Sequence, residues 1–125
     1  ESKLELDQIG YCNAHATGTD VGDPVECESI RTVWGDKINN LAVSSTKGLH
    51  GHMIGAAGAT EFMISVLALH HKKIPGTGQH FNIDPKCQLN IIQDTKTVDN
   101  LQAIISNSFA FGGTNTSLIA SIKDL

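Results

Sequence analysis

A sequence of 125 residues suffices for one domain with a buried core and is too short for two ordinary domains. Hydrophobic residues make up 40% of it and charged residues 18%, which indicates a globular protein and excludes a disordered one. The formal net charge is −4 and no basic run is longer than Lys72-Lys73, so the composition argues against nucleic-acid binding.

The three cysteines favour a reducing compartment. Cys12, Cys27 and Cys87 are odd in number and lack CxxC spacing, so they predict neither a disulfide framework nor a zinc site. Because the sequence begins at Glu1 rather than at Met, we expect it to be a piece of a longer protein, in which residues 1–125 form one domain.

The first two predicted elements are a strand at residues 9–14 and a helix at residues 21–35. Asp23 can cap the helix and Pro24 suits its first position. Glu26 stands three residues after the cap and completes a capping box. A glycine at the end of this stretch predicts where the helix stops.

The longest apolar stretch covers residues 52–71 and follows a second predicted strand at residues 41–45. Its apolar residues surround a helix on every side, which predicts a buried central helix. It is not a membrane span, because Glu61 near its middle would cost about 2.5–3.5 kcal/mol in lipid. Covering such a helix completely is difficult within one small domain, so we expect a further domain to cover part of it.

A loop and three short strands complete the chain. Turn residues fill residues 75–88, and residues 89–92 predict a short strand. Residues 103–109 and 116–122 predict two strands, joined by a glycine-containing hairpin turn at residues 110–115. Without the short strand at residues 89–92, the order β-α-β-α-β-β predicts an α/β fold with a mixed sheet.

Reactive side chains gather at strand ends and turns, where α/β proteins usually bind ligands. His15, Thr17 and Thr19 follow the first strand, in a loop that offers backbone N–H groups and two hydroxyls to a polar ligand. A hydrogen-bonded structural histidine is an equally good interpretation of His15 alone.

A second cluster surrounds His52, at the start of the predicted buried helix. The partial positive charge of a helix N-terminus keeps an imidazole neutral, and a neutral ring can donate a hydrogen bond to a developing oxyanion. Lys47, in the preceding turn, would add like-charge repulsion and attract a carboxylate. The alternative is a helix-capping histidine beside a solvated lysine.

The third cluster covers residues 107–115. Gly112 and Gly113 free the backbone to aim N–H groups at one point, as an oxyanion hole requires. The alternative is a glycine-rich hairpin turn with two core phenylalanines, Phe109 and Phe111.

Together these clusters resemble the motifs of one family. The chain contains Asn-Ala-His-x-Thr-x-Thr, then Ser-Ser-Thr-Lys with Gly-His-x-x-Gly-Ala-Ala-Gly, then Asn-Ser-Phe-x-Phe-Gly-Gly-Thr-Asn. In order and spacing, from Tyr11 to Ile122, they are similar to the β-ketoacyl-acyl-carrier-protein synthases that elongate fatty acyl chains. The resemblance implies a thiolase-like fold of two similar halves, of which this chain is the C-terminal one.

The resemblance also implies a Cys–His–His site for thioesters of acyl carrier protein, with substrates carried on its phosphopantetheine arm and no other cofactor or metal. His15 and His52 would assist malonyl decarboxylation and stabilise the enolate, while Lys47 would tune the electrostatics of the site. The remaining implied roles are pantetheine contacts for Thr17 and Thr19, gating and half of the oxyanion hole for Phe111, and structural places near the site for Glu61, Phe109, Gly112 and Gly113.

One essential group of that family has no counterpart here. The nucleophilic cysteine lies in the other half, at a buried helix N-terminus that lowers its pKa. None of the three cysteines of this chain matches it, so we expect the chain to be inactive alone. His50 stands where the family usually has a small residue, and its direction is left open by the sequence.

The expected partners are the N-terminal half of the same protein, acyl carrier protein, and a second copy in a homodimer, with neither nucleic acid nor membrane. The expected location is the bacterial cytoplasm or a mitochondrial or plastid matrix. The histidines and lysines of residues 70–73 suit the negative end of a helix dipole, with carrier-protein docking as the alternative. No cysteine or carboxylate stands at ligand spacing beside the histidine pairs, so zinc is not expected.

Three other functions compete with this interpretation. A polyketide ketosynthase domain shares His-x-Thr-Gly-Thr and Gly22-Asp23-Pro24, although the Ser-Ser-Thr-Lys form favours the fatty-acid type. A non-catalytic chain-length partner keeps the fold without a nucleophile, but retention of His15 and His52 weighs against it. A phosphate-binding module needs a glycine-rich motif that is absent.

Overall fold

The computed structural model describes residues 2–78 and 82–122. Two longer helices, α1 (Gly22–Trp34) and α3 (Ala57–His71), are separated by a short α2 (Lys47–His50). The 3-10 helices are η1 (Leu6–Gln8), η2 (Gly35–Asn40) and η3 (Ile54–Ala56). The strands are β1 (Ile9–Asn13), β2 (Ala42–Ser44), β3 (Lys73–Ile74), β4 (Lys96–Thr97), β5 (Ala103–Ala110) and β6 (Thr114–Ser121).

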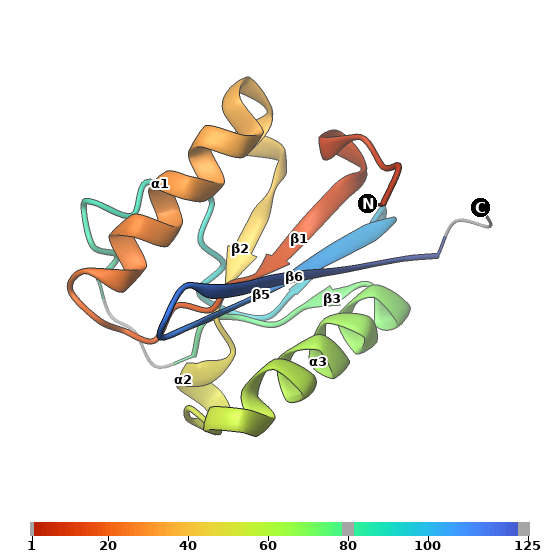
Figure 1. The fold of residues 1–125 in the computed structure, drawn as a ribbon. Coiled ribbons are helices and arrows are strands. Elements are labelled where there is room, and N and C mark those ends of the chain that lie inside the picture. The colour runs from red at the N-terminus through yellow and green to blue at the C-terminus, as the bar shows by residue number, and fades with distance from the viewer. Residues whose placement is uncertain (1, 79–81, 123–125) are drawn as a thin grey trace.

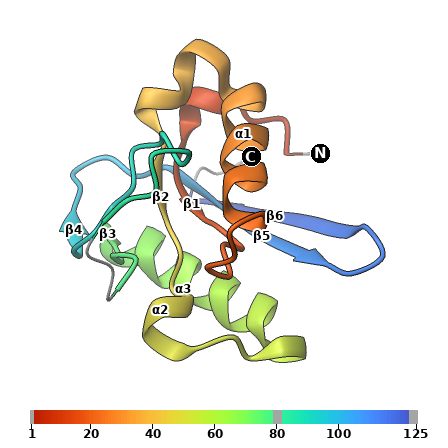
Figure 2. The ribbon, with the colours of Figure 1, turned by 90° about the vertical axis from the view of Figure 1, so that its left-hand side faces the viewer.

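Four of these strands form a mixed sheet in the order β2-β1-β5-β6. β1 runs parallel to both β2 and β5, and β6 returns antiparallel to β5. β3 and β4 form a separate antiparallel pair. α1 covers one face of the sheet and α3 the other (Figures 1 and 2), which confirms the predicted α/β layers.

Alternating residues of the central strands build two cores, because successive side chains of a strand point to opposite faces. The core under α1 includes Cys12, Ile30 and Ile105. The core under α3 includes Tyr11 and Ile104, both completely buried. β1 and β5 are therefore covered on both faces, as central parallel strands usually are.

The N-terminus of α3 lies five residues later than the predicted start at His52. Gly51 has a φ of 76° and Ile54 a φ of 49°, and positive values interrupt a right-handed helix. η3 fills the interval before Ala57. His52 therefore lies in a loop, and the prediction that it stands at a helix N-terminus is wrong.

Only one face of α3 is covered in this chain, although its sequence predicts burial on every side. Glu61 and Ser65 lie on the covered face with no exposed surface. Met63 and Leu67, on the opposite face, are 59% and 50% exposed. No helix within the two described ranges is long and apolar enough to cross a membrane.

α1 ends where the sequence predicts but begins differently. As predicted, the helix stops at Gly35. This glycine has a φ of 53°, which is unfavourable for residues with a side chain. Its N-cap is Val21, without a side-chain cap, so the predicted capping box is wrong. The Asp23 carboxylate instead accepts a hydrogen bond from the Gly18 N–H, and Glu26 is buried in other contacts.

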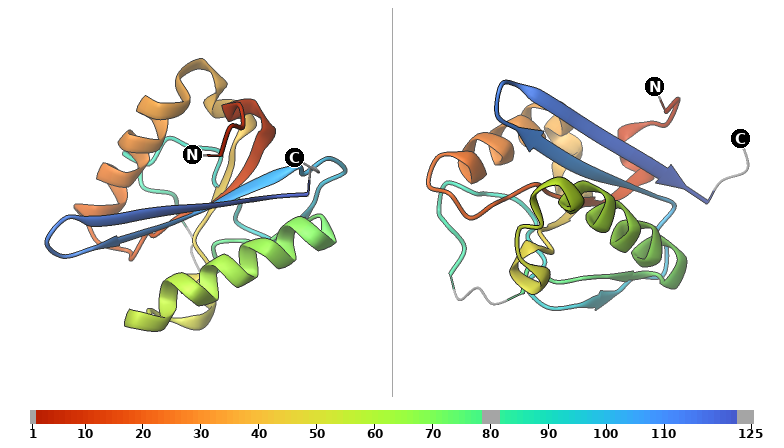
Figure 3. Two further views of the ribbon diagram at one scale, coloured as in Figure 1. Left: turned by 45° about the vertical axis from the view of Figure 1, so that its right-hand side comes forward. Right: turned by 60° about the horizontal axis from the view of Figure 1, so that its bottom comes forward.

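The predicted hairpin is present, and the predicted short strand at residues 89–92 is reduced to one bridge. β5 and β6 pair over their full lengths, and Gly112 and Gly113 take φ values near 80° in the turn. The hairpin extends well past the other strands (Figure 3). Ile91 forms a single parallel bridge with Val43 beside β2. α2 was not predicted, because its four residues carry no helical periodicity.

We expect the isolated chain to self-associate or to bind a hydrophobic dye through the uncovered face of α3, because this face exposes a row of apolar side chains. Leu67→Lys should reduce both effects, whereas Val33→Lys, at a separate exposed apolar position on α1, should change neither. Light scattering and dye fluorescence measure this. A dye-silent monomer of the unmodified chain would contradict the expectation.

Candidate active site

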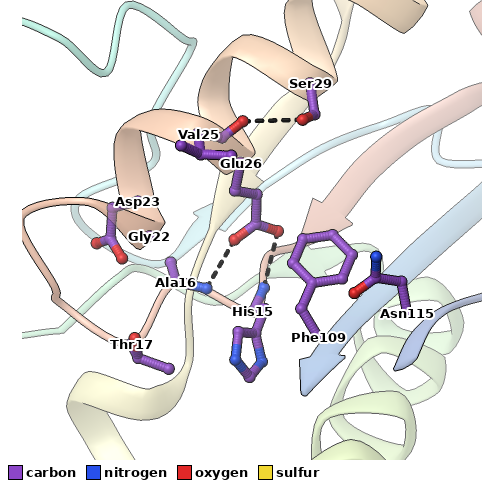
Figure 4. A pocket seen from close by; sticks show the side chains of 10 residues that line it. All are labelled: His15, Ala16, Thr17, Gly22, Asp23, Val25, Glu26, Ser29, Phe109 and Asn115. Carbon is purple, nitrogen blue, oxygen red and sulfur yellow. Dashed lines mark hydrogen bonds between the residues drawn. The ribbon is translucent and has the colours of Figure 1, made fainter. Parts of the chain in front are cut away.

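Three aromatic rings from different segments meet at the C-terminal end of β1. The ring centroids of His15 and His52 are 5.8 Å apart in an edge-on arrangement. The Phe109 ring, near the end of β5, lies 5.7 Å from that of His15. Figure 4 shows the His15 and Phe109 rings side by side below α1. The first and second sequence clusters therefore meet here, and the third contributes Phe109.

The tautomer of His52 follows from one backbone contact. The Ile54 N–H donates a hydrogen bond to His52 Nδ1 over 3.1 Å. Nδ1 must therefore be the unprotonated nitrogen, so a neutral His52 ring carries its proton on Nε2. The loop thus prepares His52 Nε2 as a hydrogen-bond donor without any contribution from a helix N-terminus.

Lys47 forms a buried ion pair with Glu61 of α3. Lys47 Nζ lies 2.5 Å from Glu61 Oε1, and the two side chains are 6% and 0% exposed. The burial of Lys47 excludes the alternative of a solvated lysine, and its carboxylate partner within the chain is Glu61. The second oxygen of Glu61 has no hydrogen-bond donor in the part of the chain that the structure describes.

The electrostatic environment of His15 favours its neutral form. Burial lowers the pKa of His15 from its ordinary value of 6.5, and the positive charge of Lys47 lowers it further. The negative charge of Glu61 acts in the opposite direction. The lysine therefore acts on His15, although the sequence reasoning considered its effect on His52.

His50 is held away from the two-histidine pair by its own hydrogen bonds. Its Nδ1 lies 2.7 Å from the Gly51 carbonyl oxygen, so Nδ1 is the donor. Its Nε2 lies 3.1 Å from Thr46 Oγ1, within hydrogen-bond distance of that hydroxyl. Asn13 Nδ2 in turn donates to Thr46 Oγ1 and to the Glu61 carbonyl oxygen. His50 therefore belongs to a network that joins β1, α2 and α3.

The threonines expected to bind substrate lie on the loop after His15. Thr17, together with His15 and Phe109, lines a cavity of about 350 Å³ below the first turn of α1. Thr19 does not line this cavity. Its hydroxyl accepts a hydrogen bond from the Gly22 N–H over 3.1 Å, which shapes the approach to α1.

The β5–β6 turn lies apart from the ring cluster. Phe111 is fully exposed there, beside Gly112 and Gly113, and does not line the cavity. The residues brought together are thus His15, His52, Lys47, Glu61 and Phe109.

The three cysteines are all free and buried. Burial raises the pKa of Cys12 strongly, and burial followed by a contact with Cys87 raises the pKa of Cys27. Both shifts suppress the reactive thiolate. Among residues 2–78 and 82–122, no three potential ligands from His, Cys, Asp and Glu gather to hold a metal ion.

Sequence reasoning missed two polar groups behind the His15 loop. Glu26 accepts hydrogen bonds from the backbone N–H groups of His15 and Ala16. Asn107 Nδ2 donates to the same carboxylate over 3.2 Å. Asn107 belongs to the third motif, and this was the only feature of the sequence that could have pointed to its position near His15. Nothing in the sequence distinguishes Glu26 from an ordinary helix-capping glutamate.

Residues 1–81 match the family model of the beta-ketoacyl synthase C-terminal domain. The chain is 44% identical to 3-oxoacyl-[acyl-carrier-protein] synthase 2 of Coxiella burnetii, covering 97% of this chain and 29% of that protein. It is 46% identical to the mitochondrial 3-oxoacyl-[acyl-carrier-protein] synthase of Arabidopsis thaliana, covering 95% of this chain and 26% of that protein.

A solved structure of the ishigamide ketosynthase/chain length factor superposes with a TM-score of 0.90 at 33% identity, over 97% of this chain and 30% of that one. The chain therefore spans less than a third of the length of these relatives.

Replacing Lys47 with Met should lower the free energy of unfolding by about 3–5 kcal/mol, because Glu61 would be left as a buried charge without a counterion. Lys37→Met removes an exposed ion pair with Asp7 and should cost less than about 1 kcal/mol. Urea denaturation followed by circular dichroism measures both. Equal losses of unfolding free energy in the two variants would contradict the larger contribution expected from the buried Lys47 pair.

The pKa of His15, followed by NMR titration, should lie below 6.5. Since the fold favours the neutral ring, the stability that His15 contributes should be complete above pH 6.5 and lost as the pH falls through the pKa of the folded state. Glu61→Gln should lower this pKa further, because it removes the opposing charge. A pKa of 6.5 or above in the unmodified protein would contradict this account.

Proposed function

The chain belongs to the β-ketoacyl synthase family as its C-terminal domain, and on that premise we propose that it forms half of an enzyme that elongates fatty acyl chains. The proposed reaction is a decarboxylative Claisen condensation between an acyl thioester and malonyl-acyl-carrier protein. The observation that carries the proposal is the pairing of His15 and His52, 5.8 Å apart, beside a buried lysine–glutamate pair.

In the proposed reaction, the acyl group is held as a thioester on a cysteine outside this chain. The malonyl thioester loses CO₂ by cleavage of its carbon–carbon bond, and the electron pair left behind forms an enolate. The enolate carbon attacks the acyl carbonyl, and the cysteine thiolate leaves. The product is a β-ketoacyl thioester on acyl carrier protein.

His15 and His52 are proposed to stabilise the enolate oxygen by hydrogen bonds from neutral imidazoles. The proton of a neutral His52 on Nε2 supports this role, as does the lowered pKa of His15. A neutral donor stabilises developing negative charge without first losing a proton. Lys47 is proposed to keep His15 neutral, and Glu61 to hold Lys47 in place.

The remaining site residues are proposed to bind and orient the substrate. Thr17 and Thr19 would contact the phosphopantetheine arm, and the position of Thr17 beside His15 on the cavity wall supports this for Thr17. Phe111 would gate the site, and its backbone N–H would form half of the oxyanion hole. Gly112 and Gly113 would permit the turn that this requires. No metal or cofactor beyond the carried phosphopantetheine takes part.

The chain is proposed to act with an N-terminal half that supplies the nucleophilic cysteine. The exposed apolar face of α3 supports this, because a second half could cover it. Acyl carrier protein and a second copy in a homodimer complete the proposed partners. The bacterial cytoplasm or a mitochondrial or plastid matrix is the proposed location, in line with the bacterial and mitochondrial relatives.

A polyketide ketosynthase is the second candidate, favoured by the similarity to the ishigamide ketosynthase/chain length factor structure. The two functions share the condensation chemistry and differ in the acyl group that is extended. Turnover of simple saturated acyl-carrier-protein primers, compared with β-keto primers, distinguishes them.

In the full-length protein, His15→Ala and His52→Ala should each reduce condensation of acyl- and malonyl-carrier protein by about 10²–10³-fold, because each removes a donor to the enolate. Thr32→Ala, on the exposed face of α1 and outside the cavity, should leave the rate unchanged. The chain alone should show no turnover. Turnover by the isolated chain would mean that one of its own cysteines is the nucleophile.

A further inference from the structure

We propose that Glu26 is a positioning residue for His15, and that its buried carboxylate determines where the His15 ring stands relative to His52 and Phe109. This inference rests on the proposed condensing function for its catalytic consequence. It does not depend on that function for its structural content.

The Glu26 carboxylate binds the backbone on both sides of the His15 α-carbon. Glu26 Oε1 accepts a hydrogen bond from the His15 N–H over 3.0 Å, and Oε2 accepts one from the Ala16 N–H over 2.8 Å (Figure 4). Hydrogen bonds to an ionised acceptor are roughly twice as strong as neutral ones. Two of them on consecutive amides hold the orientation of the peptide plane from which the His15 side chain departs.

The same carboxylate connects the His15 loop to β5. Asn107 Nδ2 donates to Glu26 Oε1 over 3.2 Å, and Asn107 Oδ1 accepts from the Ser117 hydroxyl over 2.8 Å. Phe109, whose ring contacts His15, stands two residues further along β5. Glu26 therefore joins α1, the His15 loop, β5 and β6 at one point, and it links the two strand ends that carry the ring cluster.

Packing alone does not hold the His15 loop. Glu26 and Ala16 line both the 350 Å³ cavity that contains His15 and a second cavity of about 90 Å³ behind the loop, beside Cys27 and Ile30. Unfilled volume on both sides leaves part of the loop without a close-packed neighbour. The Ser45 hydroxyl donates a hydrogen bond to the Ala16 carbonyl oxygen, and the two hydrogen bonds to Glu26 hold the N–H groups on either side of the His15 α-carbon.

The charge of Glu26 is matched by amide donors rather than by a cation. Glu26 is 4% exposed, and no ion pair to it exists within residues 2–78 and 82–122. Burial and the nearby Asp23 raise its pKa, while the three donors act against that shift. A buried carboxylate without a cation is costly to keep. A glutamate that only caps a helix does not need to be buried in this way.

The test compares Glu26→Gln with Glu28→Gln in the full-length protein. Glutamine keeps the shape of Glu26 but replaces one oxygen with an NH₂ group, so the His15 or the Ala16 N–H loses its acceptor. Glu28, two residues away on the same helix, is exposed, and among the described residues its carboxylate forms an ion pair with Arg31 alone. Glu26→Asp serves as a third variant that keeps the charge but shortens the reach.

We expect Glu26→Gln to lower kcat for condensation by about 10–100-fold with little change in KM, because a loosened His15 impairs the chemical step rather than substrate binding. Hydrogen exchange of the peptide containing His15 and Ala16 should become about tenfold faster. Glu28→Gln should leave both quantities unchanged, and Glu26→Asp should restore only part of the loss.

Equal kcat and equal exchange in the Glu26→Gln and Glu28→Gln variants would overturn the proposal. A loss of kcat that merely follows the unfolded fraction, with unchanged exchange at His15, would also overturn it, since the role would then be structural. If the full-length protein lacks condensing activity, exchange at His15 alone decides. Faster exchange then supports the positioning role, although the proposed function has failed.

Discussion

The buried ion pair between Lys47 and Glu61 is the contact on which the rest of the site depends. It fastens the short helix α2 to the covered face of α3, and the loop that carries His52 runs between these two helices. Asn13 reinforces the junction through its hydrogen bonds to Thr46 and to the Glu61 carbonyl. Because two opposite charges are buried together, the desolvation cost of each is offset only while both stay in place.

Glu26 is a second buried carboxylate, and the cost of burying its charge is offset by hydrogen-bond donors rather than by a cation. Glu61 faces a lysine, whereas Glu26 faces two backbone amides and Asn107. Burial is the main cause of the lowered pKa of His15, and the first arrangement adds the positive charge of Lys47, which lowers this pKa further. The second orders the backbone without adding positive charge beside the histidine. We therefore propose that the two buried carboxylates have different roles: Glu61 holds the lysine that acts on the charge of the site, and Glu26 holds the backbone of the His15 loop.

The parts of the fold that could be predicted are those encoded by local patterns. The end of α1 at Gly35 and the β5–β6 hairpin follow from glycines at positive φ. The delayed start of α3 could not be predicted, because Ile54 adopts a left-handed conformation that its side chain disfavours. The hydrogen bonds of Glu26 could not be predicted either, because its partners are distant in sequence. The same residues in the sequence also fit a capping box. For Glu26, contacts distant in sequence rather than local propensity determine its surroundings.

The position of β1 between β2 and β5 has a kinetic consequence. Ile9 pairs with Ala103, so the central strand completes its pairing only with a segment from almost the other end of the described chain. Parallel pairing over such a span requires a large loop to close, and the entropy cost of closure comes before the pairing contacts form. Folding is therefore slowed. During synthesis, β1 therefore has one edge without a hydrogen-bonded neighbour until β5 has left the ribosome. In that interval its unpaired N–H and C=O groups and its apolar side chains are open to association with other chains.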